Sequence, residues 1–394
     1  MGGDKNDPLH GGKTRKKLEE PASLGATVER WHEWKGYKIT SIAERDPDYN
    51  MLDGSAIYSP LSDRTLRLTG QRGLQPGDVI VSVNGESVLR VPDLHMLLRG
   101  MAGRSVRLDV VRLASALNDP NDEWAHSGQK PESVIVVPIS QKDASNLRYA
   151  AWEYQTRTMA KRLADEAGFS VGYVHLRSMS GASAIDSFFR GFYPDHDKVG
   201  LIVDVRHNIG GSIDSWVLDI LQRKAWEFWK SRNMNMDTGI GWNERFAFLG
   251  HLVILTDEKT SSDAEGLARG VSELGLGQIV GRRTWGGGIW LSFNNPLVDG
   301  GVVSAPQMGT YNDHYGWGLG IEQMGVTPHV DVDNDPRVFY SGRDMQLERA
   351  IQVLSDWLRD EPIAFPNDPG KPKDMSLKKD LDSCPVPVPV PPVR

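Results

Sequence analysis

The stretch "GLIVDVRHNIGGSIDSWVLDILQRK", Gly200–Lys224, indicates the fold class of this chain. It opens with a near-continuous apolar run, which is typical of a strand buried on both faces of a sheet. A loop containing a glycine pair follows. Apolar residues then recur at helical spacing, namely Ile213, Trp216, Val217 and Ile220. A buried strand that leads through a short loop into an amphipathic helix favours an α/β domain.

The same alternation continues on both sides of this stretch. Strands are predicted at "VGYVHLR" (171–177), "HLVILT" (251–256) and "GQIVGRR" (277–283), and helices at 263–274 and 343–360. The segment "IWLSFNNPLVDGGVVSAPQ" (289–307) is predicted to form a hairpin that turns at Asp299–Gly301. We therefore expect an α/β core over residues 146–361, followed by a Pro-rich, extended or disordered tail over 362–394.

The region before this core lacks the alternation of predicted strands and helices. Residues 36–113 predict a compact β-rich domain, in which "GLQPGDVIVSVNGESV" (73–88) contains a strand and an Asn84-Gly85 hairpin turn. Residues 1–35 are expected to be a charged, irregular N-terminal segment with one short candidate strand near Ala26–Val28. Residues 114–145 are expected to be a linker that ends in a strand, "ESVIVVPIS".

The composition narrows the range of functions. The formal net charge of −7 gives no electrostatic basis for binding nucleic acid or an anionic membrane. No apolar run reaches the roughly 18 residues that a spanning helix needs, and the N-terminus lacks the apolar core of a signal peptide. The one cysteine, Cys384, permits no disulfide within the chain. We expect a cytoplasmic protein without a metal or another cofactor.

The first loop with possible chemistry is the glycine pair Gly210-Gly211. Paired glycines let the backbone turn sharply, and N–H groups at the start of a helix suit a developing oxyanion. An ordinary strand-to-helix turn explains the same residues, so the local sequence leaves both interpretations open.

The second loop is "TSSDAE", residues 260–265, between a predicted strand and a predicted helix. Ser262 and Glu265 have the spacing of a capping box, which stabilises a helix N-terminus. A serine at such a corner can also be an exposed nucleophile. Spacing alone does not decide between a cap and a nucleophile at Ser262, and Ser261 beside it remains an alternative.

Five motifs in a fixed order resemble the catalytic region of the tricorn proteases. They are "GYVHLRSM" (172–179), "GLIVDVRHNIGG" (200–211), "TSSDAE" (260–265), "GLGQIVGRRTWGGG" (275–288) and "GIEQMGVTPHV" (320–330). More loosely, they resemble the C-terminal-processing serine peptidases of the same superfamily. The likeness covers residues 36–360. It implies an α/β core of the ClpP/crotonase-like type, preceded by a PDZ-like domain that binds extended chain by adding a strand to a sheet edge.

The resemblance also implies roles for single residues. It places the nucleophile on Ser262 and leaves Ser261 as a supporting loop residue. The oxyanion hole falls on the N–H groups of Gly210 and Asp263, with help from Gly211. The acidic member of the catalytic group falls on Glu322, where it would orient the base.

The base itself is not found near Ser262. The processing peptidases use a lysine that follows the serine, but the matching segment here, "RRTWGGG" (282–288), has arginines, which stay protonated and cannot act as a base. The tricorn branch uses a histidine beside a serine, before the PDZ-like domain. Residues 1–35 contain no Ser-His pair, so we expect a truncated N-terminus or a misassigned start. His10, His32 and His207 lack the family context.

The sequence thus predicts a serine endopeptidase that hydrolyses peptides or unfolded proteins through an acyl-enzyme. The alternative is a catalytically incomplete protein that binds peptides through its PDZ-like domain. Acyl-CoA chemistry on a crotonase-like fold is a third hypothesis, which Ser262 and the PDZ-like domain disfavour. The resemblance also suggests a homo-oligomer, and the aromatic-rich segment 224–246 is a candidate for a substrate or subunit contact.

Overall fold

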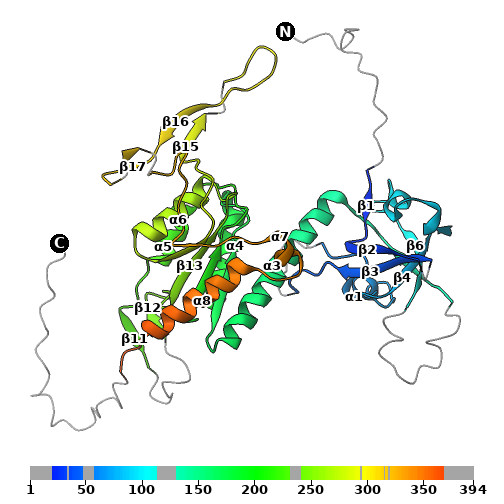
Figure 1. Cartoon of the computed structure of the whole chain (residues 1–394), viewed down its shortest axis with the longest axis horizontal. Helices are drawn as coiled ribbons and strands as arrows, with labels where there is room; N and C mark the ends of the chain where they lie inside the picture. Colours follow the sequence, from blue (N-terminus) through cyan, green and yellow to red (C-terminus); the bar gives the residue numbers. More distant parts are fainter. Residues whose placement is uncertain are drawn as a thin grey trace, which may run out of the picture. The chain divides into compact units, whose positions relative to one another are not determined.

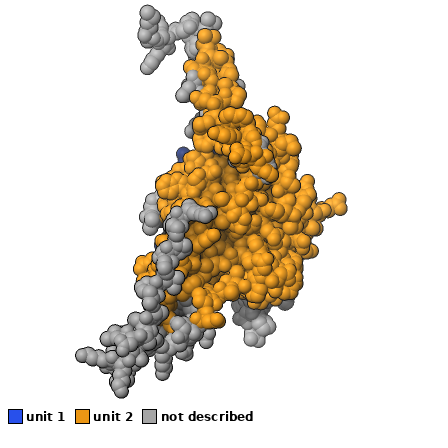
Figure 2. Space-filling view, turned by 90° about the vertical axis from the view of Figure 1, so that its left-hand side faces the viewer, with its two compact units in different colours: residues 1–158 blue, residues 159–394 orange. Residues whose placement is uncertain are grey.

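The structure is a computed structural model. It describes residues 20–32, 35–47, 57–112, 130–230, 241–292, 295–314, 316–317 and 320–367. The predictions for residues 1–19, including His10, for much of the linker and for the tail beyond 367 lie outside these residues. The chain forms two compact units, residues 1–158 and 159–394, and Figure 2 shows one face of the second unit in orange.

The first unit is built on an antiparallel sheet. Its strand order is β2 (Ala26–Trp31), β3 (Gly36–Ile42), β4 (Val79–Val83), β6 (Val106–Val111) and β7 (Glu132–Val136), and β5 (Glu86–Ser87) also pairs with β4. Asn84 and Gly85 connect β4 to β5 with φ angles of 51° and 83°, as the predicted hairpin turn requires.

Short elements complete this unit: β1 (Ala22–Ser23) paired with β8 (Ile139–Ser140), α1 (Asp63–Arg67), and the 3₁₀ segments η2 (Val88–Arg90) and η3 (Leu94–Leu98). The buried core joins alternate residues of the sheet, such as Ile39 and Leu108, to Leu94 and Leu98 of η3. Strands β2 and β7 lie outside the expected interval 36–113, yet both pair at the edges of this sheet. We therefore propose that the domain extends over residues 22–140.

The second unit contains a parallel five-stranded sheet. Its order is β19 (Val330–Asp331), β14 (Gly277–Gly281), β13 (His251–Thr256), β10 (Gly200–Asp204) and β9 (Val171–His175). Every residue of β10 is buried. Parallel sheets need cover on both faces, which explains the near-continuous apolar sequence of this central strand and confirms the α/β interpretation.

Helices supply that cover (Figure 1). Helices α4 (Gly181–Phe192), α5 (Asp214–Leu221) and α6 (Asp263–Glu273) pack on one face, in the cluster that contains Leu201 and Val203 of β10. Helix α8 (Met345–Asp360) and the end of α3 (Gln141–Glu166) pack on the other face, in the cluster that contains Ile202. The alternation along β10 divides the core between the two faces.

Smaller elements lie around this core. They are η4 (Tyr193–Asp195), α7 (Pro336–Tyr340), and the two-stranded pairs β11 (Glu227–Trp229) with β12 (Gly241–Asn243), β15 (Ile289–Ser292) with β16 (Ala305–Gly309), and β17 (Tyr311–Asn312) with β18 (Gly316–Trp317). The β15–β16 hairpin turns where the sequence predicted, with the N–H of Leu297 bonded to the carbonyl of Gly301 at 2.8 Å. Among the described residues, no helix is long and apolar enough to cross a membrane.

Candidate active site

Two loops leave neighbouring parallel strands at the same edge of the sheet. One runs from β10 to α5 and contains the glycine pair, and the other runs from β13 to α6 and contains Ser262. The N–H of Ser261 donates to the carbonyl of Asn208 at 2.9 Å. The Asp263 carboxylate accepts the N–H groups of Ile213 at 2.7 Å and Asp214 at 3.1 Å. The two loops are therefore bonded directly to each other.

Gly210 lies against Ser262. A Cβ atom on Gly210 would stand 2.6 Å from the Cβ of Ser262 and 2.9 Å from the nitrogen of Asp263, and the φ angle of +95° also favours glycine. A Cβ atom on Gly211 would stand 1.9 Å from the carbonyl oxygen of Met179. The glycine pair thus permits a close approach that brings the predicted oxyanion residues to the predicted nucleophile.

Ser262 has an unusual backbone conformation. Its φ of 56° and ψ of −124° lie outside the regions that non-glycine residues normally occupy. It is the N-cap of α6. One hydrogen bond of the predicted capping box is present, from the N–H of Ser262 to the Glu265 carboxylate at 2.9 Å, whereas the N–H of Glu265 donates to the Ser262 carbonyl at 2.8 Å. Strained residues persist only where the surrounding contacts hold them, and a strained serine between strand and helix is typical of exposed nucleophiles.

The nearby backbone donors are not equivalent. Asp263 is the first residue of α6, and the first N–H groups of a helix have no partner within the helix. The N–H of Gly210 donates to the side-chain oxygen of Asn208 at 2.7 Å. Gly211 and Met179 form an isolated parallel bridge. Its two hydrogen bonds run from the Met179 N–H to the Gly210 carbonyl and from the Ser212 N–H to the Met179 carbonyl, so the N–H of Gly211 takes no part in them.

Glu265 does more than cap the helix. Its side chain is fully buried, and it accepts the Thr284 hydroxyl and the N–H groups of Gly286 and Gly287, the latter two at 2.8 Å each. It therefore ties the Ser262 loop to the glycine-rich loop that follows β14. Of the hydrogen bonds that Glu265 accepts, the capping-box spacing predicted only the one from the Ser262 N–H. The others depend on residues about twenty positions later, for which the local sequence has no signal.

Glu322 holds the next part of the same glycine-rich loop. Its half-buried carboxylate accepts the N–H groups of Gly288 at 2.9 Å and Ile289 at 3.0 Å. The predicted acidic residue and Glu265 thus bind four consecutive backbone N–H groups, those of residues 286–289.

Asp257 and His207 link the two loops a second time. The Nδ1 atom of His207 lies 2.7 Å from the Asp257 carboxylate, which also accepts the N–H groups of His207 at 3.0 Å and Thr260 at 2.9 Å. Burial opposes ionisation of Asp257, but these hydrogen bonds outweigh it and lower the pKa of the carboxyl group. The sequence did not indicate this pair.

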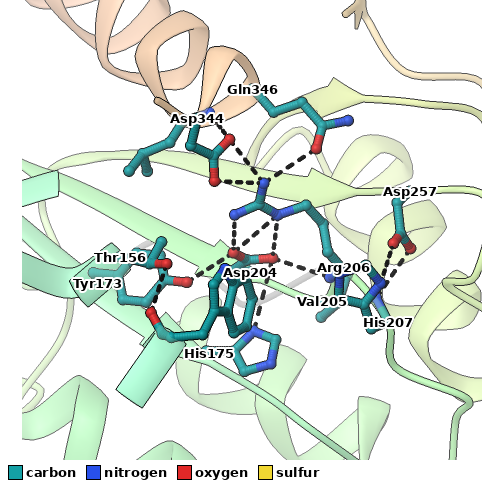
Figure 3. A network of polar contacts seen from close by, with 12 residues as sticks. Thr156, Tyr173, His175, Asp204, Val205, Arg206, His207, Asp257, Asp344 and Gln346 are labelled. Atoms are coloured by element: carbon teal, nitrogen blue, oxygen red, sulfur yellow. Dashed lines mark hydrogen bonds and ion pairs between the residues drawn. The ribbon is translucent and has the colours of Figure 1, made fainter. Parts of the chain in front are cut away.

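A buried ionic network lies at the carboxyl end of β10 (Figure 3). The Arg206 guanidinium, 2% exposed, contacts the Asp204 carboxylate at 2.6 Å and the Asp344 carboxylate at 2.8 Å, and the Tyr173 hydroxyl donates to Asp204 at 2.7 Å. Burial alone would raise the pKa of Asp204, but Arg206 holds it well below its usual value. The network joins β10, just before the glycine pair, to the N-cap of α8.

Asp263 carries a second carboxyl group of interest. Burial, and then the nearby Asp214 carboxylate, raise the pKa of Asp263 to about 6. The first residue after Ser262 therefore titrates near neutral pH while its carboxylate caps the start of α5.

Comparison with known proteins identifies the class. Residues 170–332 match peptidase family S41, and residues 71–112 match the PDZ domain. The chain therefore combines a PDZ domain with an S41 peptidase domain that has a mixed α/β core. Both candidate loops lie inside the peptidase match.

Relatives define the branch of the family. The chain is 30% identical to tricorn protease homolog 1 of Streptomyces coelicolor over 91% of its own length, and 28% identical to the tricorn protease of Thermoplasma acidophilum over 75%. The crystal structure of the tricorn protease matches 86% of this chain and 29% of that chain, with a TM-score of 0.69 at 22% identity. The chain is thus related to the tricorn proteases of peptidase family S41. It spans 30% and 25% of the lengths of those two relatives.

Proposed function

We propose that this chain carries the catalytic site of a serine endopeptidase. The observation that supports it is the close approach of Gly210 to Ser262, a strained serine at the N-terminus of α6. The Ser262 hydroxyl attacks the carbonyl carbon of a peptide bond and forms a tetrahedral intermediate. Collapse of that intermediate expels the amine and leaves an acyl-enzyme, which water then hydrolyses.

In this proposal the oxyanion is bound by backbone N–H groups at the junction of the two loops. Asp263 supplies one donor, because its N–H stands at the start of α6 beside Gly210. Gly211 supplies the second. In this structure the N–H of Gly210 donates to the Asn208 side chain. It can therefore bind the oxyanion only after that hydrogen bond breaks. Loss of one such donor typically slows catalysis about 10²–10³-fold.

The proton of Ser262 passes, in this proposal, to a histidine from the segment that precedes the PDZ domain, as in the tricorn proteases that the sequence resembles. Glu322 supports the site by fixing the backbone of Gly288 and Ile289. We also propose that the core is of the ClpP/crotonase-like type, which its parallel sheet with helices on both faces supports.

The substrates proposed are peptides and unfolded proteins. An unfolded segment can add as a strand to an open edge of the PDZ sheet, where β2 and β7 are the outermost strands. This mode recognises backbone more than side chains, so it suits a broad range of sequences.

A matched pair of serine variants tests the function. Hydrolysis of a fluorescently quenched unfolded protein by the complete protein should fall by roughly 10³-fold or more in Ser262→Ala, because the nucleophile is removed. The neighbouring variant Ser261→Ala should stay within about tenfold of the wild type. Full activity in Ser262→Ala would refute Ser262 as the nucleophile. Absence of hydrolysis by the complete wild-type protein would refute the proposed peptidase function.

A further inference from the structure

A surface of aromatic side chains lies on the β11–β12 hairpin of the second unit. Phe228 of β11 and Trp242 of β12 are cross-strand partners, and their ring centroids are 6.4 Å apart. The N–H of Trp226 donates to the carbonyl of Asn243 at 2.7 Å, so the strand pairing continues to Trp226. Strand alternation then places Trp226, two residues before Phe228, on the same face of the hairpin. Trp226 is 71% exposed, so this face presents an aromatic ring to water.

The chain returns to this surface after its last helix. The Nε2 atom of His251 lies 2.7 Å from the carbonyl oxygen of Glu361, the residue after α8. Phe365 then packs against Trp242 with ring centroids 6.5 Å apart, and Figure 1 shows α8 ending beside β11 and β12. The described residues end at Asn367, so the rest of the chain starts at this surface. We call the aromatic platform the four residues Trp226, Phe228, Trp242 and Phe365.

The remaining chain ends in a sequence that suits aromatic side chains. Residues 385–393, "PVPVPVPPV", carry no charge, and five of the nine are proline. Proline holds φ near −65° and favours the polyproline II helix, which aromatic-lined grooves bind at a small cost in entropy. Alternate prolines also lack the N–H groups that a strand needs, so this stretch is a poor partner for a sheet edge. Its sequence therefore favours contact with the faces of aromatic rings.

The length of chain before this stretch is enough to bring it back to the aromatic platform. Residues 368–384 separate the last described residue from Pro385. A random chain of this length spans on the order of 20–25 Å, whereas the three residues of β11 cover about 10 Å. Such a tether holds its end near the platform at a concentration in the millimolar range. Contacts too weak to retain a free peptide are therefore sufficient within the chain.

We propose that the aromatic platform binds residues 385–393 of the same chain, with proline rings on the faces of Trp226 and Phe365. These two are the most exposed members of the platform, at 71% and 42%. Trp242 anchors the platform to the unit, because it is half-buried and its indole N–H donates to the carbonyl of Ala247 at 2.9 Å. The bound stretch covers aromatic surface that otherwise faces water, which stabilises the contact.

A spin label on the full chain tests the proposal. The one cysteine, Cys384, immediately precedes the Pro-rich stretch and accepts a nitroxide. With isotope only in tryptophan, the indole signals are followed by NMR and assigned by single Trp→Phe substitutions. The nitroxide should broaden the signals of Trp226 and Trp242 far more than that of Trp290 on the β15–β16 hairpin. Replacing the five prolines of residues 385–393 by serine keeps the tether length and should reduce this broadening at least about threefold.

Matched variants separate the two partners of the contact. Trp226→Ala should reduce the broadening of Trp242 at least about threefold, because it removes a ring that the prolines cover. Trp216→Ala should leave the broadening unchanged, since Trp216 is comparably exposed, at 63%, but lies on α5. On the tail, Pro369→Ser with Pro372→Ser should also have no effect, because these prolines lie outside the Pro-rich stretch.

Two outcomes would overturn the proposal. The first is equal broadening in the wild type and in the variant with five serines, which would show that the tether alone brings the label near. The second comes from a mixture of an isotope-labelled Cys384→Ser chain with a spin-labelled chain that carries no isotope. If that mixture broadens Trp242 as strongly as the single chain does at the same total concentration, the tail of a second copy occupies the platform.

Discussion

The two loops of the candidate active site are held in place by different physical means. The glycine-pair loop follows a buried charged network, in which the Arg206 guanidinium forms ion pairs with both the Asp204 and the Asp344 carboxylate. The Ser262 loop is held by two carboxylates, Asp257 and Glu265, that mainly accept backbone N–H groups. The position of the glycine-pair loop therefore depends on buried ion pairs. The position of the Ser262 loop depends on hydrogen bonds from uncharged backbone N–H groups to two carboxylates.

The largest effect is expected from Arg206→Met. This substitution keeps an unbranched side chain but leaves two buried carboxylates without their cation, which typically costs 3–5 kcal/mol. Urea denaturation should show this loss in the free energy of unfolding. The control Arg282→Met breaks an exposed pair with Asp331 and should cost at most about 1 kcal/mol. Equal costs for the two variants would show that the buried network is not held by charge.

A smaller effect is expected from Glu265→Gln. The amide group of glutamine would face backbone N–H donors that the carboxylate now accepts, so buried donors lose their partners at a cost of about 2–3 kcal/mol. Covalent labelling of Ser262 should also slow, because the strained backbone of this serine loses a support. Glu273→Gln, near the exposed end of the same helix, removes an ion pair with Arg269, so it should cost at most about 1 kcal/mol and should not slow the labelling. An unchanged labelling rate in Glu265→Gln would show that Glu265 does not support the reactive conformation of Ser262.

The free energy of unfolding should depend on pH through the Asp263 carboxyl group. The folded pKa of Asp263 is about 6 and the unfolded value is near 3.9, so the folded state binds more protons between these values. Stability from this group is therefore present below about pH 4 and is lost as pH rises to about 6, with a total on the order of 2 kcal/mol.

Asp214→Asn should reduce that loss, because it removes the neighbouring negative charge that contributes to the raised pKa of Asp263. Unfolding curves at several pH values should show a flatter profile than the wild type between about pH 4 and pH 6. Asp219→Asn, on an exposed part of the same helix, should keep the wild-type profile. A profile that steepens in Asp214→Asn would refute the assigned interaction.

The smallest effect on stability is expected from Glu322→Gln. Its carboxylate is half-buried and accepts two backbone N–H groups, which the oxygen of glutamine can still accept in part, so the cost should be about 1 kcal/mol or less. Thermal unfolding would measure it. A cost equal to that of Glu265→Gln would mean that the two glutamates support the loop to the same extent.

The sequence predicted those parts of the site that depend on neighbours along the chain. The buried strand at 200–204, the glycine pair and the Ser262–Glu265 capping box all have local patterns, and the structure confirms the strand, the turn at the glycine pair and one hydrogen bond of the capping box. That the two loops act in one site was implied by the resemblance alone, because the parallel order of the strands is known only from the structure.

The supports of the site were not predicted, because they join residues far apart in the sequence. Arg206 binds Asp344, 138 positions later, and Asp257 binds His207, 50 positions earlier. Arg206 and Asp257 each follow a strand, and no local sequence pattern indicates which distant residue either of them binds. For the same reason the sequence did not indicate that β2 and β7 pair at the edges of the first sheet.

The central claim is that Ser262 is the nucleophile, and active-site labelling tests it most directly. The complete protein is treated with a fluorophosphonate, digested, and analysed by mass spectrometry to locate the modified residue. We expect label on Ser262, loss of label in Ser262→Ala, and retention of label in Ser261→Ala. Label on Ser261, or label that persists in Ser262→Ala, would contradict it.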